Sequence, residues 1–291
     1  MDKLDYMVQP TFQRDWVERG GLYIVLAFFL GGLGGGLYLI SLYFDHYAGI
    51  TVSFFIVAAS TLGYLLHLGK PARFWRAFLK PQTSWISRGM IAATGFLLFV
   101  FLQLAPGIPW LSWLPWTINN NLVQALAITS AVVLITYKGF TLGELNAIPF
   151  WNTALMPMIF LVYSLLGGTG LTIGMLVGAG STIIELSMVV VIANWLLVIA
   201  VTILGIYLWI SYNGNPVLKY SVIQLIKGRV APYFVGGVIL VGLLVPLLIG
   251  GLGFLYQIPD FLILTSAICE LAGVFFITYS ILKAGVYAPV I

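Results

Sequence analysis

Charged residues are scarce in this chain. Asp, Glu, Lys and Arg make up only 8% of its 291 residues, whereas 61% are hydrophobic. A soluble domain of this length would carry about 25% charged residues. Only lipid can hide so much apolar surface from water, so the composition excludes a soluble globular protein. It indicates a polytopic helical membrane protein that is surrounded by membrane lipid, and we expect no nucleic-acid partner.

Cysteine and histidine are also rare. The single cysteine, Cys269, excludes a disulfide framework and supplies too few thiolates for an iron–sulfur cluster. His46 follows the first apolar run and His67 follows the second, so the two histidines should lie on opposite membrane faces, whereas a haem held by two histidines needs both at similar depth. We therefore expect no haem, no iron–sulfur cluster and no metal site in this chain. Any redox cofactor would be borrowed from a partner, diffusible or absent.

Apolar runs long enough to cross a bilayer, which takes about 20 residues, recur between the charged residues. The first run is too long for the core of a signal peptide, so we expect it to be mature structure. The predicted spans are 22–44, 47–66, two spans between Arg88 and Lys138, one that begins near Pro149, one from Glu185 to Asn213, 230–255 and 261–282.

This pattern predicts an all-α integral membrane protein with eight transmembrane helices, arranged as two four-helix bundles. Residues 1–291 would form a single membrane domain. Within it we expect an N-terminal segment over 1–21, helices 1–4 over 22–142 and helices 5–8 over 143–291.

Glycine, tryptophan and proline add local expectations. The run Gly31–Gly36 contains two small-xxx-small pairs, which favour close helix packing, and the alternative is a thin wall beside a flat ligand. A second glycine-rich stretch, 167–180, predicts a turn after the fifth span. Trp110, Trp113 and Trp116 predict an interfacial belt. Pro157 and Pro246 are expected to interrupt the fifth and seventh spans.

The Lys and Arg residues are distributed unevenly between the loops. The N-terminal segment holds three, the loop after the second span five, the loop after the fourth one, the loop after the sixth three and the C-terminus one, which accounts for all 13. Cytoplasmic loops carry such an excess, so we predict that both termini and the loop around His67 are cytoplasmic. The alternative is that some of these cations dock an acidic partner.

The densest polar chemistry lies in the connection 66–89, between the second and third spans. Pro71 and Pro81 prevent a regular helix through it. Its basic side chains are His67, Lys70, Arg73, Arg76, Lys80 and Arg88.

A quinone needs an apolar slot, hydrogen-bond donors at its two carbonyl oxygens and a proton route. His67 and Tyr137 end spans at the same water boundary, so we predict that they bind the two quinone oxygens. Lys70 and Arg73 are predicted to belong to the same quinone-binding site, where they would raise the local potential and attract the partner or a charged form of the ligand. Taken singly, each residue also has a plainer interpretation: an interfacial histidine, a belt tyrosine and cations that set the topology.

Further residues are expected around this site. Glu144 is a candidate proton carrier between the site and water. Glu270, in the middle of the eighth span, is a second candidate, because a buried ionisable group is costly and is functional by default. The alternative for Glu270 is a protonated acid that only ties two helices together. Arg76, Lys80 and Arg88 are expected to dock a partner.

Several segments carry a resemblance to a known family. HLGKPARFW, residues 67–75, resembles the (D/H)LGxPxRFW segment of the NrfD-type family, the membrane subunits of polysulphide reductase and DMSO reductase complexes. The stretch from Tyr137 to Asn152, YKG…PFWN, is similar to the tyrosine-glycine and P-F/L-W-N signature of that family. KGRVAPYFVGGVILVGLLVPLLIGG and LKAGVYAP are similar to other family segments, so the resemblance covers nearly the whole chain.

The resemblance implies a haem-free subunit of the prokaryotic inner membrane that reacts with menaquinone or ubiquinone. Its partners would be a ferredoxin-like iron–sulfur subunit and a molybdopterin subunit that carries the main catalytic site. Tyr137 falls on a quinone-site tyrosine of the polysulphide reductase branch, and His67 falls on a histidine implicated in quinol oxidation in the DMSO reductase branch. Trp151 and Asn152 match PFWN and should frame the site. In those relatives this loop faces an exported subunit, whereas the charge count here places it in the cytoplasm.

Two alternatives remain open at this level. A secondary transporter would also have proline-interrupted spans in its two halves, although Glu270 and Glu185 are the only acidic residues available as charges within the spans. An inert anchor would lack quinone chemistry altogether. Co-purification of iron–sulfur and molybdopterin subunits would separate a redox anchor from a transporter, and quinone activity would separate an active anchor from an inert one.

Overall fold

The computed structural model describes residues 11–14, 16–18, 20–68, 70–111, 120–179, 183–253 and 255–288, and of residues 183–185 it describes the backbone only. Within these residues, eight helical segments are long and apolar enough to cross a membrane. They are α1 (Leu22–Tyr43), α2 (Tyr47–His67), α3 (Trp85–Leu104), α4 (Asn121–Gly143), α5 (Leu155–Ala179), α6 (Ile183–Tyr212), the continuous pair η5 (Pro232–Leu244) and α8 (Val245–Gly253), and α9 (Asp260–Lys283). The predicted all-α, multi-pass membrane fold with eight spans is confirmed.

Short elements connect or flank the spans. They are β1 (Thr11–Phe12), η2 (Pro71–Phe78), η3 (Ala105–Gly107), η4 (Pro109–Leu111), α7 (Pro216–Ile226) and β2 (Val286–Tyr287). The helix α7 was not predicted, because the loop signal at Asn213–Pro216 masked the helix that Asn215 caps directly after it. Trp110 is 85% exposed in η4, whereas Trp113 and Trp116 lie outside the described residues.

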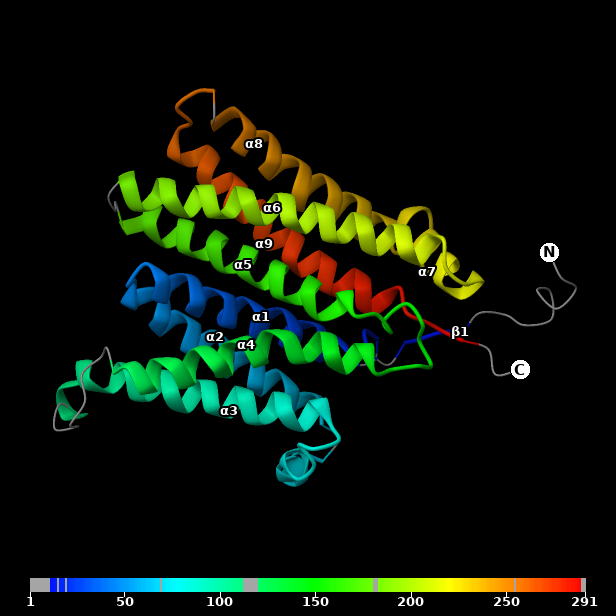
Figure 1. The fold of residues 1–291 in the computed structure, drawn as a ribbon, viewed down its shortest axis with the longest axis horizontal. Helices are drawn as coiled ribbons and strands as arrows, with labels where there is room; N and C mark the ends of the chain where they lie inside the picture. Colours follow the sequence, from blue (N-terminus) through cyan, green and yellow to red (C-terminus); the bar gives the residue numbers. More distant parts are fainter. Residues whose placement is uncertain are drawn as a thin grey trace, which may run out of the picture.

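The spans run side by side, and helices adjacent in sequence lie next to each other (Figure 1). The helices α1 and α5 form the centre, since 78% and 72% of their spans are buried, against at most 44% for the other spans. Because α1 packs closely against both α2 and α5, the division into two four-helix bundles stays a prediction.

The spans define two faces of the molecule. The first face carries the start of α1, His67 at the end of α2, η2, the loop after α4, α7 and the end of α9. The strands β1 and β2 pair antiparallel there and join the two terminal segments of the chain (Figure 1). The second face carries the turn between α1 and α2, where the His46 ring accepts a hydrogen bond of 3.1 Å from Gly49 N–H and caps α2. The two histidines therefore lie on opposite faces, as predicted.

The glycines of α1 bring helix backbones together. A Cβ at Gly36 would lie 1.9 Å from the carbonyl oxygen of Ser164, and one at Gly168 would lie 2.4 Å from the carbonyl carbon of Gly36, so α1 and α5 touch through their main chains. A Cβ at Gly34 would lie 2.6 Å from Cγ2 of Val57, so here a side chain of α2 packs against the α1 main chain. Close helix packing is therefore the role of most of this run.

The predicted glycine-rich turn over 167–180 is wrong. The helix α5 continues through these glycines to Ala179, and Gly167, Gly168 and Gly170 face neighbouring helices instead of bending the chain. Pro157 lies in the first turn of α5, where proline is tolerated, so it does not interrupt the span. Pro246 lies where the π-helical segment η5 changes into the α-helix α8.

Candidate functional site

A cavity of about 380 Å³ lies at the first face, among the ends of α1, α2, α3 and α4 and beneath η2. Its lining residues are Trp16, Ile24, Phe28, Tyr64, Leu65, His67, Leu68, Phe74, Ala77, Ile86, Met90, Tyr137 and Thr141. Small-molecule sites have volumes of about 300–1,000 Å³ and mostly apolar walls with a few placed polar groups. This cavity fits a flat, apolar ligand that carries few polar atoms.

The loop sequence explains one wall of the cavity. The helix α2 ends at His67, and Lys70, which precedes Pro71, has a non-helical backbone (φ −139°, ψ 81°). Side chains three residues apart eclipse one another in a 3-10 helix. In η2, Phe74 and Ala77 therefore share the face that lines the cavity.

Two tyrosines supply the innermost polar groups. The hydroxyl of Tyr137 lies 2.6 Å from that of Tyr64 and donates a hydrogen bond to it, and both residues line the cavity. Each hydroxyl carries one proton and the bond between them uses one, so the pair keeps one hydroxyl proton available to a ligand. Tyr64 was missed in the sequence, although its position one turn before His67 on α2 places the two on one helix face.

His67 lies at the mouth of the same cavity. Its Nδ1 is 3.2 Å from the carbonyl oxygen of Gly20, and the ring is exposed. A neutral ring that donates Nδ1–H to this carbonyl keeps Nε2 as an acceptor, whereas a protonated ring can donate from Nε2. His67 can therefore either take a proton from a ligand hydroxyl or give one to a ligand carbonyl. The structure thus brings His67 and Tyr137 together, as the sequence placed them.

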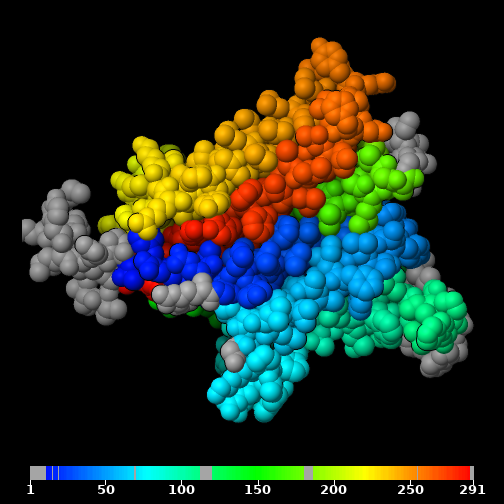
Figure 2. All heavy atoms as spheres, turned by 180° about the vertical axis from the view of Figure 1, so that it is seen from behind, coloured from blue at the N-terminus to red at the C-terminus, as the bar shows by residue number. Residues whose placement is uncertain are grey.

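The cationic residues of η2 lie outside the cavity. Lys70 and Arg73 are exposed and do not line it. Arg76 and Lys80 instead line a second, shallower hollow of about 360 Å³, which shares Ala77 and Ile86 with the first cavity. The η2 segment projects from the helices, visible as the cyan protrusion in Figure 2. Any effect of these cations on the cavity would act through space and not by contact.

Arg88 has local partners. Its guanidinium donates to the carbonyl oxygens of Pro81 and Gln82, each at 2.8 Å, and lies 4.2 Å from the ring centroid of Trp85. Trp85 in turn stacks on Phe140 of α4. Arg88 therefore fixes the loop that leads into α3.

Trp151 and Asn152 lie behind the cavity. The fully buried Trp151 donates from Nε1 to the carbonyl oxygen of Ile281 at 2.8 Å and contacts Trp16, which lines the cavity. Asn152 is exposed and donates to the side chain of Asn146. Trp151 thus ties the loop after α4 to α9 and Asn152 ties the loop to itself, and their role as a frame of the site stays a prediction.

The two acidic candidates occupy different regions. Glu144 caps the end of α4, is exposed at the first face, and follows Tyr137 and Thr141 at helical spacing. Glu270 lies mid-way along α9 and is only 2% exposed. The side chain of Glu185 lies outside the described set.

Lys138 differs most from its sequence interpretation. It was counted as a loop cation, but it lies within α4 and is fully buried. Its Nζ donates to the carbonyl oxygen of Phe28 at 2.5 Å and lies 3.1 Å from where a Cβ of Gly31 would be. No carboxylate pairs with it among the described residues. Part of the glycine run of α1 therefore makes room for this side chain.

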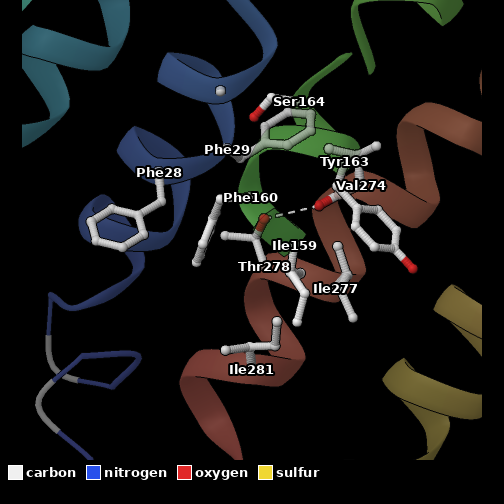
Figure 3. A pocket seen from close by; sticks show the side chains of 11 residues that line it. Phe28, Phe29, Ile159, Phe160, Tyr163, Ser164, Val274, Ile277, Thr278 and Ile281 are labelled. Carbon is white, nitrogen blue, oxygen red and sulfur yellow. Dashed lines mark hydrogen bonds between the residues drawn. The ribbon is translucent and has the colours of Figure 1, made fainter. Parts of the chain in front are cut away.

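The interior between α1, α5 and α9 is nearly solid. Phe28, Phe160 and Thr278 are among the residues that line a void of only about 10 Å³ there. Figure 3 labels their side chains. The described residues contain no group of three His, Cys, Asp or Glu side chains that could hold a metal ion.

Comparison with known proteins agrees with this architecture. A family model described as polysulphide reductase, NrfD, matches residues 19–289. The match therefore includes all eight spans, η2 and every residue that lines the cavity except Trp16. No curated protein matches the chain.

Proposed function

We propose that this chain, which belongs to the polysulphide reductase (NrfD) family of membrane subunits, passes electrons between an iron–sulfur partner and the membrane quinone pool. The observation that carries the proposal is the largely apolar cavity at the first face, in which Tyr64, His67 and Tyr137 meet. A quinone is flat and apolar and needs donors only at its two carbonyl oxygens, which suits this lining. Menaquinone and ubiquinone share these features.

The side chains divide the work between two ends of the ligand. The remaining hydroxyl proton of the Tyr64–Tyr137 pair can bond one oxygen, while the bond between the two residues holds both hydroxyls in place. His67 can bond the other oxygen and exchange a proton with it, because Gly20 fixes its ring. Glu144, exposed at the end of α4, would pass that proton to water. A bound quinone would supply the two-electron, two-proton chemistry.

The projecting η2 segment would receive the partner. Four exposed cations around the cavity would attract an acidic, ferredoxin-like iron–sulfur subunit: Lys70, Arg73, Arg76 and Lys80. A molybdopterin subunit would exchange electrons with that iron–sulfur subunit. A bound cluster would then lie over the mouth of the quinone site. Arg88 would support this surface indirectly, through the loop that it ties.

The charge count supports a cytoplasmic position for the first face in a prokaryotic inner membrane. A reporter enzyme fused after Ile291 should therefore be active only if it works in the cytoplasm. Activity of an exported phosphatase at this position would refute the orientation, and with it the cytoplasmic partner.

The quinone site is tested by single substitutions in the intact complex. Tyr64→Phe and Tyr137→Phe keep the rings and remove only the hydroxyls, and His67→Gln removes the titrating ring. Loss of one such donor should cost about 1–3 kcal/mol, a fall in quinone turnover of about fivefold to a hundredfold. Activity of the catalytic partner with a soluble artificial redox dye should stay normal in each variant.

Tyr163→Phe is the matched control. Tyr163 is 3% exposed, and its hydroxyl has no hydrogen-bond partner in the described part of the chain, but it does not line the cavity. Its loss should leave quinone turnover unchanged. Normal quinone turnover in all three site variants would indicate that the chain is an inert anchor or that the quinone site lies elsewhere. Isolation of the chain without redox subunits would favour a transporter.

A further inference from the structure

A second polar region lies in the half of the membrane next to the second face. Glu270 of α9 is 2% exposed, and one carboxyl oxygen accepts a hydrogen bond of 3.3 Å from the Ser266 hydroxyl. The other oxygen, Oε2, is fully buried and has no partner among the described residues. Buried polar groups that lack a protein partner are commonly satisfied by water.

The space for such a water is present. Glu270, Ser266 and Asn194 line a void of about 20 Å³ between α5, α6, α8 and α9. A void needs about 10–15 Å³ to hold one water, and the water needs two to four polar partners. The carboxyl group, the hydroxyl and the Asn194 amide provide these partners.

This void continues outward. A larger cavity of about 680 Å³ reaches Tyr256, Gln257 and Asp260, at the loop between α8 and α9 on the second face. The two spaces have five lining residues in common: Val190, Asn194, Gly250, Ile258 and Ile263. They are therefore adjacent, and Asn194 is their common polar side chain.

Gly250 leaves the room that Asn194 occupies. A Cβ at residue 250 would lie 2.2 Å from Oδ1 of Asn194, so any larger residue would push the amide across the connection. The next residue, Gly251, has no atom within 4 Å of the corresponding position. The narrowest polar point of the passage is thus built by one glycine and one asparagine.

We propose that these two spaces form a water-filled inlet through which Glu270 exchanges protons with the second face, with Asn194 at its constriction. The inference deepens the proposed function, on which it rests for its purpose, because quinone chemistry takes up or releases protons. The inlet opens on the face opposite the quinone cavity. Glu270 is then the inner end of a half-channel and not only a tie between helices.

The charged surroundings of Glu270 are simple. No other residue of the inner void is titratable, and Cys269 is its neighbour in sequence. Asp260 and Tyr256 line only the outer cavity. Among the described side chains of α6, α8 and α9 that form the inlet, Glu270 is therefore the innermost group able to carry a proton.

Cysteine accessibility tests the route. In a Cys269→Ser background, Ser266→Cys should react with Ag⁺, a membrane-impermeant thiol reagent about as small as a water molecule, when it is added at the second face and not when it is added at the first. Thr278→Cys, also buried on α9 but outside both cavities, should stay unreacted from either side. Adding Gly250→Val should slow the Ser266→Cys reaction at least tenfold, whereas Gly251→Val should not.

Infrared spectroscopy tests the proton itself. The carboxyl band that disappears in Glu270→Gln should shift promptly in D₂O, and Gly250→Val should delay that shift at least tenfold. The inlet would be refuted by a carboxyl band that does not exchange in D₂O. It would also be refuted if Ser266→Cys, in folded protein, did not react or reacted with reagent added at the first face. Neither measurement uses quinone, so such a failure would leave the proposed quinone site standing.

Discussion

The position of Tyr137 depends on a glycine in the neighbouring helix, which makes Gly89→Ala an informative perturbation. Gly89 is buried in α3, and a Cβ there would lie 2.2 Å and 2.3 Å from Cδ2 and Cε2 of Tyr137. Ordinary contact begins at 3.4 Å. The alanine variant therefore requires the tyrosine ring, or the whole helix, to move by about 1 Å.

A movement of this size would break the polar pair. The hydroxyls of Tyr137 and Tyr64 are 2.6 Å apart, and a shift of about 1 Å takes them to the limit of a hydrogen bond. Loss of the bond alone costs about 1 kcal/mol, and a misplacement of about 1 Å at a reacting site can cost about a hundredfold in rate. We expect quinone turnover to fall by about tenfold to a hundredfold, although Gly89→Ala removes no polar group.

The assay is quinone turnover of the assembled complex, with activity toward a soluble redox dye as reference. Overpacking of this kind costs about 1–3 kcal/mol, so assembly should survive. Gly205→Ala, whose methyl would have no atom within 4 Å, is the control and should behave as wild type. In the double variant with Tyr137→Phe, the losses should not add, because both act on the same hydroxyl. Normal turnover of folded Gly89→Ala, or strictly additive losses, would refute the role of Tyr137.

Three further substitutions test the packing, each followed by the midpoint of unfolding in denaturing detergent. Gly36→Ala sets a methyl 1.9 Å from a main-chain oxygen that cannot turn away, so it should destabilise by about 1–3 kcal/mol or more, and stability equal to that of Gly205→Ala would contradict the α1–α5 contact. Trp151→Phe removes a buried indole donor and should cost about 1–3 kcal/mol, which an unchanged midpoint would disprove. Lys138→Met exchanges a buried cation for an apolar chain of similar length and should be neutral or stabilising, whereas a loss above about 3 kcal/mol would mean that the fold needs the cation.

The fold could largely be predicted from the sequence, because a helix that crosses lipid needs a long apolar run without charged residues. Each apolar run bounded by charged residues forms a helix. The error arose where glycine was taken as a turn residue, as it often is in soluble proteins. Adjacent glycines such as Gly167 and Gly168 often mark turns in soluble proteins, but within a membrane span they allow α5 to approach its neighbouring helices closely. This close-packing rule was applied to Gly31–Gly36 but not to residues 167–180, and the wrong turn prediction followed from that omission.

The site was readable only in part. His67 and Tyr137 were found because both end spans at one boundary, and Tyr64 could have been found from its helical spacing to His67. Trp16 could not, since nothing local predicts that the N-terminal segment folds against the cavity and Trp151. Lys70 and Arg73 were assigned to the slot because they follow His67 closely, but the eclipsed geometry of η2 turns Phe74 and Ala77 inward instead.

Lys138 shows that a lysine near the end of a span can be buried, although most lysines at such positions reach water. Counting it as a loop cation was reasonable, because most lysines near span ends reach water. The other 12 Lys and Arg residues still belong to segments assigned to one face, so the orientation does not depend on it. A cation buried in a span is expensive, and here two glycines of α1 are used to admit it. Gly31→Ala would set a methyl 3.1 Å from Nζ and 2.8 Å from the Ser60 hydroxyl, so the glycine run and the lysine form one structural unit. In a membrane protein, a glycine-rich helix is therefore a reason to search the facing helices for a buried polar side chain.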